Sequence, residues 1–487
     1  MIIVLSPLAA GNWMNMLARV VCFTERDNAS PDPEDVRLGG RSTTLPPLRL
    51  AHNFLWTFLG NVSQAVSQLL LLIVIVKWGG LQAAGLWILI SSLCSSAFTF
   101  SELGLRSLLI CDVLREYRFQ DYYSLRFFLT VLAVLGLLLF GCFAYGAGTT
   151  LALLVIMSVG RAFDSLSDIC YGLLQREERM DRIGLGMMFR YVAGTIVMAT
   201  LVTSGYGLVT AAALNSAVAA LVYWFWSRQN AKRLLAGFHR PGASSPPLIV
   251  EELRLIRPER LWLSLIWLSV PLAIVAVEIN LATNLPRYLV DSILGRESLA
   301  VFATLLQFAA AGMIFVQAMG NALAPRLTRY YQSNQFRRFV MLLGRFVGMA
   351  LLLGMIPFVV LWTAPGRAIM AWMFSPQFLD DLPAVRWLTI AVCLLYLTGP
   401  RGRGVTSVLR FRSHVVIRGA TLAMMLVLIP PLATAYGLSG AAMGLTFALA
   451  ATLPFYGWVI LRAWQQGTKR TIVTLNKSHA ASSRAAA

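Results

Sequence analysis

Long apolar stretches separated by short polar loops make up most of the chain. Because a membrane-spanning helix needs about 20 mostly apolar residues, these stretches predict about twelve transmembrane helices. They cover residues 54–76, 82–105, 127–145, 150–173, 185–203, 206–226, 261–283, 298–321, 340–362, 385–399, 414–434 and 438–461. Only 13% of the residues are charged, whereas a soluble domain carries about 25%. The pattern therefore predicts an all-α integral membrane protein.

The basic residues are concentrated on alternate loops. Nearly all of the 41 Lys and Arg residues lie in the two tails and in the loops 106–126, 176–190, 228–260, 326–345 and 401–418. An excess of Arg and Lys on alternate loops marks the cytoplasmic side of a membrane protein. We therefore expect a multi-pass membrane protein with both termini in the cytoplasm. The net charge of +19 follows from this topology, so we expect no nucleic-acid partner.

Polar segments divide the chain into five parts. Residues 1–48 are polar and Pro-rich and predict a disordered cytoplasmic tail. Residues 49–227 and 261–462 each hold six apolar stretches, which predict two six-helix lobes. A basic cytoplasmic linker, 228–260, joins the lobes, and a cytoplasmic tail, 463–487, follows the second lobe.

The two halves share a repeat. The sequence YGL followed by two alanines occurs at Tyr206–Leu208 and again at Tyr436–Leu438. The preceding stretches agree loosely, with Arg190 in one and Arg418 in the other. Copies separated by six spans keep the same orientation, which predicts a pseudo-two-fold axis along the membrane normal and a central cavity between two bundles.

Charged residues lie inside the fourth stretch. Arg161, Asp164 and Asp168 fall on one side of a helix, and the arginine can pair with Asp164 three residues later. Ionisable groups inside a membrane usually face a cavity or a partner. Two interpretations remain open, a charged cavity lining with Asp164 and Asp168 as ion-coupling sites, or an internally neutralised structural pair.

Amide side chains form two further stripes. The first stretch carries Asn61, Gln64 and Gln68 on one face, and the eighth carries Gln307, Gln317 and Asn321. Such stripes can join neighbouring helices or line a hydrated lumen. Amides suit sugar hydroxyls because they both donate and accept hydrogen bonds.

The seventh stretch carries Glu278 and continues into Asn284 and Arg287. We expect Pro286 to break this helix at the outer surface and the polar side to face a hydrated chamber. A buried glutamate is a candidate proton or cation site, and the alternative is a salt bridge from Glu278 to Arg287 or Arg161.

No sequence motif indicates an enzyme. The six Cys and four His residues lack metal-ligand spacing, and the chain has no phosphate loop or dinucleotide fingerprint. We expect neither a cofactor nor a metal. A membrane enzyme of polysaccharide polymerisation is a competing class, but its large extracytoplasmic loop is missing. Asp380–Asp381, the one acidic pair on the outer loops, predicts a solvated loop or a helix cap.

Two segments carry a family resemblance. NLPRYLVDSILG, beginning at Asn284, and QAMGNALAPRLTRYY, beginning at Gln317, resemble the central signature of bacterial polysaccharide flippases. These belong to the multidrug/oligosaccharidyl-lipid/polysaccharide exporter (MOP) superfamily. Residues 164–190 resemble the connection between the fourth and fifth spans of the same family.

The resemblance implies a function. Members move oligosaccharides linked to undecaprenyl pyrophosphate across the inner membrane by alternating access, through a cationic cavity between two lobes. Carried over, Arg161 and Arg287 would hold the pyrophosphate, and Arg106 would lie where it enters. Membrane lipids and polysaccharide assembly enzymes would be partners. Because Arg161 is the one arginine well inside a predicted span, we expect a less cationic cavity here.

Two relatives of the flippases are alternatives. A multidrug extruder would use an acid inside the membrane, in the first lobe, to couple transport to a cation. The first stretch has no acid, so Asp164 and Asp168 would take this role. A flippase for the lipid-linked cell-wall precursor usually has more than twelve spans.

Overall fold

The computed structural model describes residues 50–112, 117–237, 260–310, 312–333, 335–364, 368, 382–408 and 411–485. Every regular element in these ranges is a helix, as the apolar stretches predicted. The predicted N-terminal tail, most of the predicted linker and the Asp380–Asp381 pair lie outside them. The described helices belong to one compact unit, Leu48–Ala487.

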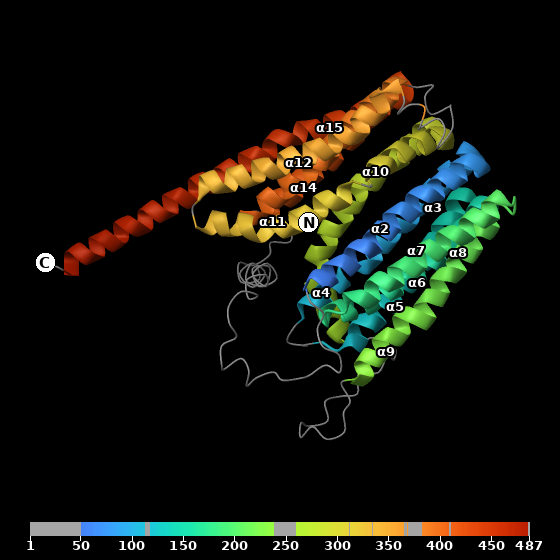
Figure 1. Ribbon diagram of the computed structural model, residues 1–487, viewed down its shortest axis with the longest axis horizontal. Helices are drawn as coiled ribbons and strands as arrows, with labels where there is room; N and C mark the ends of the chain where they lie inside the picture. The colour runs from blue at the N-terminus through green and yellow to red at the C-terminus, as the bar shows by residue number, and fades with distance from the viewer. Residues whose placement is uncertain are drawn as a thin grey trace. The chain divides into compact units, whose positions relative to one another are not determined.

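The first half of the chain forms one helical bundle, drawn in blue to green in Figure 1. Its elements are α2 (Leu50–Val74) with a wider terminal turn, η2 (Ile75–Gly79), α3 (Gly80–Glu102), α4 (Leu105–Cys111), α5 (Phe119–Tyr145), α6 (Thr149–Arg176), α7 (Met180–Thr203), α8 (Leu208–Val222) with the turn η3 (Tyr223–Ser227), and α9 (Arg228–Gly237). Within this bundle α2 packs against α7, α5 packs against α6, and α8 packs against both α6 and α7.

The second half contains α10 (Arg260–Ala310), α11 (Met313–Gln332), α12 (Phe336–Trp362), α14 (Leu382–Ser407) and α15 (Phe411–Ala485). The helix α14 packs against α11, α12 and α15. In contrast, α10 packs against α15 and also against α3 of the first bundle, so it joins the two bundles.

Eight helices in the described part of the chain are long and apolar enough to cross a membrane, or nine with the bent pair in α10. Two of them, Leu55–Glu102 and Ser413–Gln465, have 48 and 53 residues. At 1.5 Å per residue each is more than twice the roughly 30 Å of a bilayer core. Each therefore holds two spans. The chain turns within them at Gly80 (φ 84°) and Gly437 (φ 60°), and within α10 at Gly295 (φ 84°). Dividing the three at these glycines gives the twelve predicted spans.

Large apolar side chains cover the outside of the helices. Phe143 is 96% exposed, Phe225 74%, and Leu352 71%. Such side chains are rarely left in water over so large a surface, and a bilayer would cover them. The chain is thus a multi-pass, all-α membrane protein, which confirms the predicted fold class.

The YGL repeat has the same structure in both halves. Gly207 has φ 83° and Gly437 has φ 60°, a conformation that glycine adopts without a steric cost. The preceding tyrosines, Tyr206 and Tyr436, are 66% and 64% exposed. The alanine pairs that follow, Ala211–Ala212 and Ala441–Ala442, are buried in both copies. These matching features support the predicted parallel repeat.

Some helix ends differ from the predicted ones. The helices α5 and α7 begin at Phe119 and Met180, several residues earlier than the apolar stretches indicated. The prediction that Pro286 breaks the seventh helix is wrong, because α10 stays helical through this buried residue until Gly295. A proline removes one backbone donor, and the packing of α3 along α10 holds the helix together. At the other end of the chain, α15 continues through the predicted tail to Ala485.

Candidate functional site

A cavity of about 670 Å³ lies among α2, α3, α6, α7, α8 and α10. Six residues of the predicted site line it: Gln68, Arg161, Asp164, Asn284, Arg287 and Gln307. They come from helices of the first bundle and from α10. The cavity thus lies where α10 meets the first bundle, and its wall carries both charges and amides.

Asp164 is bound by Arg190 rather than by Arg161. The Arg190 guanidinium donates to both carboxylate oxygens of Asp164, from Nε at 2.7 Å and from Nη2 at 3.1 Å, and from Nη1 to Asn215 at 2.9 Å. Gly194, one turn further along α7, leaves room for this arrangement, since a Cβ there would lie 2.8 Å from the Arg190 Nη1 atom. The predicted pairing of Arg161 with Asp164 is therefore replaced by an interhelical pair between α6 and α7.

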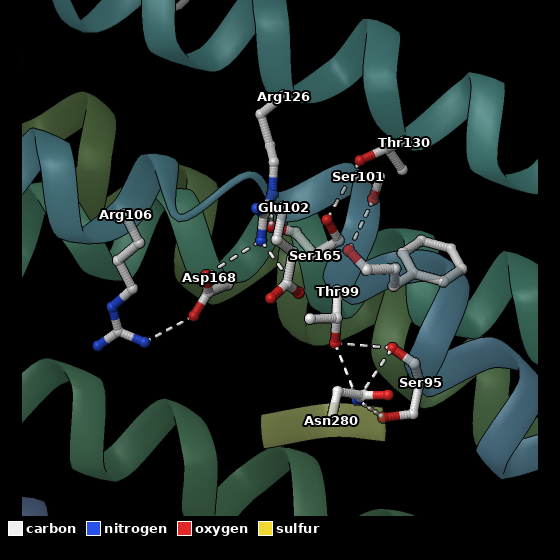
Figure 2. A network of polar contacts seen from close by, with 11 residues as sticks. Ser95, Thr99, Ser101, Glu102, Arg106, Arg126, Thr130, Ser165, Asp168 and Asn280 are labelled. Carbon is white, nitrogen blue, oxygen red and sulfur yellow. Dashed lines mark hydrogen bonds and ion pairs between the residues drawn. The ribbon is translucent and has the colours of Figure 1, made fainter. Parts of the chain in front are cut away.

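Asp168 lies at the centre of a second ionic network, which Figure 2 shows from close by. Arg106 donates to one of its oxygens at 2.6 Å and Arg126 to the other at 3.1 Å. Arg126 also contacts Glu102 at 3.2 Å, and Arg106 donates to Gln175 at 2.7 Å. The side chain of Arg126 is only 1% exposed. Of these five residues only Glu102 lines the cavity, so Arg106 and Asp168 lie behind its wall.

The NLPRY segment packs its polar side against α3. Asn280 donates to Ser95 Oγ at 2.8 Å and to Thr99 Oγ1 at 3.0 Å, a contact visible in Figure 2. Asn284 in turn donates to Asn280 at 2.9 Å, and Arg287 donates to Asn284 at 3.1 Å. This chain of hydrogen bonds explains why an apolar helix carries two amides and an arginine at this point.

Two arginines of the cavity wall lack a carboxylate partner within the described residues. Arg161 makes neither a hydrogen bond nor an ion pair there, and it interacts with Asp164 and Glu102 only through the longer-range electrostatic field. Arg287 bonds only to neutral oxygens, and its Nε atom is buried without a partner. The two carboxylates of the wall, Asp164 and Glu102, are held by Arg190 and Arg126. The wall thus carries three arginines against two carboxylates and is positive, and the expected lower charge than in related flippases stays a prediction.

The amide side chains of the two predicted stripes differ in their surroundings. Gln307 donates to Gln68 at 3.2 Å, which joins α10 to α2. Asn61 donates to the Thr57 carbonyl of its own helix at 2.9 Å, and Gln64, although half-buried, does not line the cavity. The side chains of Gln317 and Asn321 lie outside the described residues.

Glu278 is separate from the cavity. It faces α15, where its Oε1 atom would lie 3.9 Å from a Cβ added at Gly419, and its buried Oε2 atom has no partner. The alternative salt bridge to Arg287 or Arg161 is absent from the ion pairs of the described chain. The described residues contain no group of three His, Cys, Asp or Glu side chains that could hold a metal ion.

Sequence reasoning missed Arg126, Arg190 and Glu102. Both arginines were counted with cytoplasmic loops, Arg126 with 106–126 and Arg190 with 176–190, although Arg190 also lies near the start of the stretch 185–203. In the structure both lie within helices, seven and ten residues past the helix starts at Phe119 and Met180. The repeat offered a signal, since Arg190 and Arg418 hold comparable places in the two halves.

The chain is similar to known proteins in sequence and in fold. No family model matches the chain. The capsular polysaccharide biosynthesis protein CapF of Staphylococcus aureus is 20% identical over 418 residues, which are 84% of this chain and 98% of that protein.

Solved structures give the same picture. The inward-facing conformation of a multidrug resistance MATE family transporter of the MOP superfamily matches with a TM-score of 0.62 at 15% identity, over 85% of this chain and 96% of the other. Its outward-facing counterpart gives 0.56 at 14% identity, over 86% and 95%. A MOP transporter from Pyrococcus furiosus, described as having a binding pocket of reverse polarity, gives 0.55 at 14% identity, over 84% and 94%. The predicted resemblance is thus confirmed: the chain has the two-bundle fold of MOP-superfamily transporters and is similar to a protein of capsular polysaccharide biosynthesis.

Proposed function

We propose that this transporter is a flippase for oligosaccharide repeat units linked to undecaprenyl pyrophosphate, which serve the assembly of a surface polysaccharide. The observation that carries the proposal is the pair of arginines, Arg161 and Arg287, that face the cavity without a carboxylate partner in the described chain. A cationic cavity between membrane helices favours an anionic cargo.

The chemistry of the wall fits such a cargo. Guanidinium groups bind phosphate oxygens through forked, charge-assisted hydrogen bonds. Gln68, Asn284 and Gln307 would serve the sugar hydroxyls. A volume of about 670 Å³ lies within the range of roughly 300–1,000 Å³ typical of ligand sites. The headgroup would occupy this cavity while the lipid tail stays in the bilayer.

Transport would proceed by alternating access. The close packing of α3 on α10 would close one end of the cavity, and rocking of the bundles would close the other. Arg106 would release its hold on Asp168 as the lipid pyrophosphate enters. Asp164, Asp168 and Glu278 remain the candidates for ion coupling, and Glu278 is the one of the three with a carboxylate oxygen free of hydrogen bonds.

A multidrug extruder is the second candidate, and the same network argues against it. A cationic drug needs an available acid, but Asp164 is held by Arg190 at 2.7 Å and Asp168 by two arginines.

The transporter fold likewise favours a protein without enzyme activity. We place it in the bacterial inner membrane with both termini in the cytoplasm. Its partners would be membrane lipids and polysaccharide assembly enzymes, without nucleic acid.

A deletion strain tests the proposal. Loss of a surface polysaccharide, with its lipid-linked repeat unit retained on the cytoplasmic face, is the expected result. Wild-type protein should restore the polysaccharide and Arg161→Gln should not, whereas Arg338→Gln, which changes an exposed arginine of α12, should. Normal surface glycan together with new sensitivity to cationic drugs would support the extruder instead.

A further inference from the structure

The second bundle contains an arginine whose counterpart in the first bundle is neutralised. Arg190 lies on α7, ahead of the YGL turn, and its charge is balanced by Asp164 of α6. Arg418 holds the comparable place on α15, but no acid occurs anywhere in α14. Beyond Glu297 the sequence has no acids other than Asp380 and Asp381. Within the described residues of the second half, only α10 therefore carries acids that could neutralise these arginines.

Further donors gather around Arg418. His414 lies one turn earlier on α15, and Arg401 lies on α14. Arg418 interacts electrostatically with His414, with Tyr456 and with Glu278 of α10, and Arg401 interacts with the same tyrosine. The rings of His414 and Tyr456 lie 6.0 Å apart. Three helices thus bring two arginines, one histidine and one glutamate together.

The donors of this cluster are unused. The Arg401 Nη1, His414 Nδ1 and Arg418 Nε atoms are buried and have no hydrogen-bond partner in the described chain. A buried donor without a partner, and a buried cation above all, carries a large free-energy cost. Glu278 offsets one positive charge but forms no ion pair with Arg418 within the described residues. At least one positive charge is left over.

We propose that Arg401 of α14 and His414 and Arg418 of α15 form a second anion site, which binds a phosphoryl group. A phosphoryl group supplies several acceptor oxygens and negative charge, which are what these donors lack. None of the three residues lines the cavity, so this site is distinct from that of the proposed cargo. The phosphoryl group could come from a phospholipid headgroup or from a soluble phosphate compound.

Ligand-dependent thermal stability of the full chain in a neutral detergent tests this site. One arm adds phosphatidylglycerol, with phosphatidylcholine as the uncharged reference. The other adds sodium pyrophosphate, with sodium chloride at equal ionic strength. The variants are Arg418→Gln and His414→Gln. Arg462→Gln is the matched control, because Arg462 is an exposed arginine of the same helix that stacks on Trp458.

We expect one of the two phosphates to raise the melting temperature of the wild type and of Arg462→Gln over the same concentration range. Arg418→Gln should need about tenfold more ligand, the effect of losing one charge-assisted hydrogen bond. A response to phosphatidylglycerol alone identifies a lipid headgroup, and a response to pyrophosphate identifies a soluble ligand. In the Arg161→Gln variant, the rise in melting temperature with phosphate should be unchanged and should still depend on Arg418. This result would show that the site is separate from the cavity.

The proposal is overturned if neither phosphate stabilises the wild type, or if Arg418→Gln and Arg462→Gln respond alike. Should Arg418→Gln fail to fold, Arg418→Lys keeps the charge and loses the fork. Arg418→Lys and His414→Gln must then each need more of the phosphate than the wild type for the same rise in melting temperature.

Discussion

Replacing Arg126 by methionine removes a buried charge while keeping most of the side-chain volume. Arg126 is only 1% exposed, and it contacts Asp168 at 3.1 Å and Glu102 at 3.2 Å. Removing one partner of a buried ion pair typically costs about 3–5 kcal/mol. Water reaches the two carboxylates, whose side chains are 29% and 37% exposed, and Arg106 still holds Asp168. We therefore expect a smaller loss, of about 2–3 kcal/mol, in the free energy of unfolding.

Equilibrium unfolding in mixed micelles of increasing sodium dodecyl sulfate content measures this loss. The matched control is Arg338→Met, because Arg338 is an exposed arginine that bonds only to Gln335 of the preceding turn at 3.0 Å. Its expected effect is within about 0.5 kcal/mol. The double variant Arg126→Met, Glu102→Gln should recover part of the loss, since the second change removes a stranded carboxylate. Equal effects of Arg126→Met and Arg338→Met would refute the view that the Asp168 network stabilises the first bundle.

Three further predictions concern single contacts. Asp164→Asn leaves the Arg190 guanidinium without its carboxylate and should cost about 2 kcal/mol in the same unfolding assay, and an unchanged midpoint would contradict the pairing. Gly295→Ala forces a side chain into φ 84° and should cost about 1–3 kcal/mol, whereas Gly457→Ala, with open space around a helical glycine, should not destabilise. Gly85→Ala would place a Cβ 2.1 Å from the Arg296 carbonyl oxygen and should separate α3 from α10. A cysteine placed at Gln82, which bonds Glu297 across this contact at 3.1 Å, should then react faster with a membrane-impermeant maleimide, and equal rates would count against the role of Gly85.

The sequence predicted the helices better than their ends. Apolar runs determine where a helix can meet lipid, so each of the twelve stretches lies almost entirely in helices of the described chain, with breaks at 103–104, 206–207 and 312. The ends depend on polar residues that packing can draw inward. Arg126 and Arg190 were counted with the cytoplasmic loops, yet α5 and α7 begin before them. Counting basic residues per loop cannot distinguish an arginine at the membrane surface from one that a carboxylate of another helix holds inside the bundle.

The site was predicted in part for a related reason. Helical spacing brings Arg161, Asp164 and Asp168 to one side of α6, but it cannot reveal a partner on another helix. Arg190 lies 26 residues from Asp164 in sequence, and Arg106 lies 62 residues from Asp168. These partners decide which arginines remain for a ligand, so the charge of the cavity emerges only from the packing of α3, α5, α6 and α7.

The amide stripes were predicted with both possibilities open, and the structure assigns Gln68 and Gln307 to both. The Gln68–Gln307 bond joins two helices, and both residues also line the cavity. Asn284, expected to face a hydrated chamber just before a helix break at Pro286, is only 3% exposed. Its place follows from the continuity of α10 through Pro286, which the local sequence does not reveal.

Transport by the purified protein tests the central claim most directly. Proteoliposomes would contain undecaprenyl-pyrophosphate-linked oligosaccharide in the bilayer, and an added membrane-impermeant glycosidase would report how much of the glycan has crossed. The account predicts protein-dependent crossing that Arg161→Gln and Arg287→Gln each reduce at least about tenfold, as the loss of one charge-assisted contact implies, while Arg338→Gln leaves it unchanged. Equal crossing by the wild type, by both cavity variants and by protein-free liposomes would contradict it.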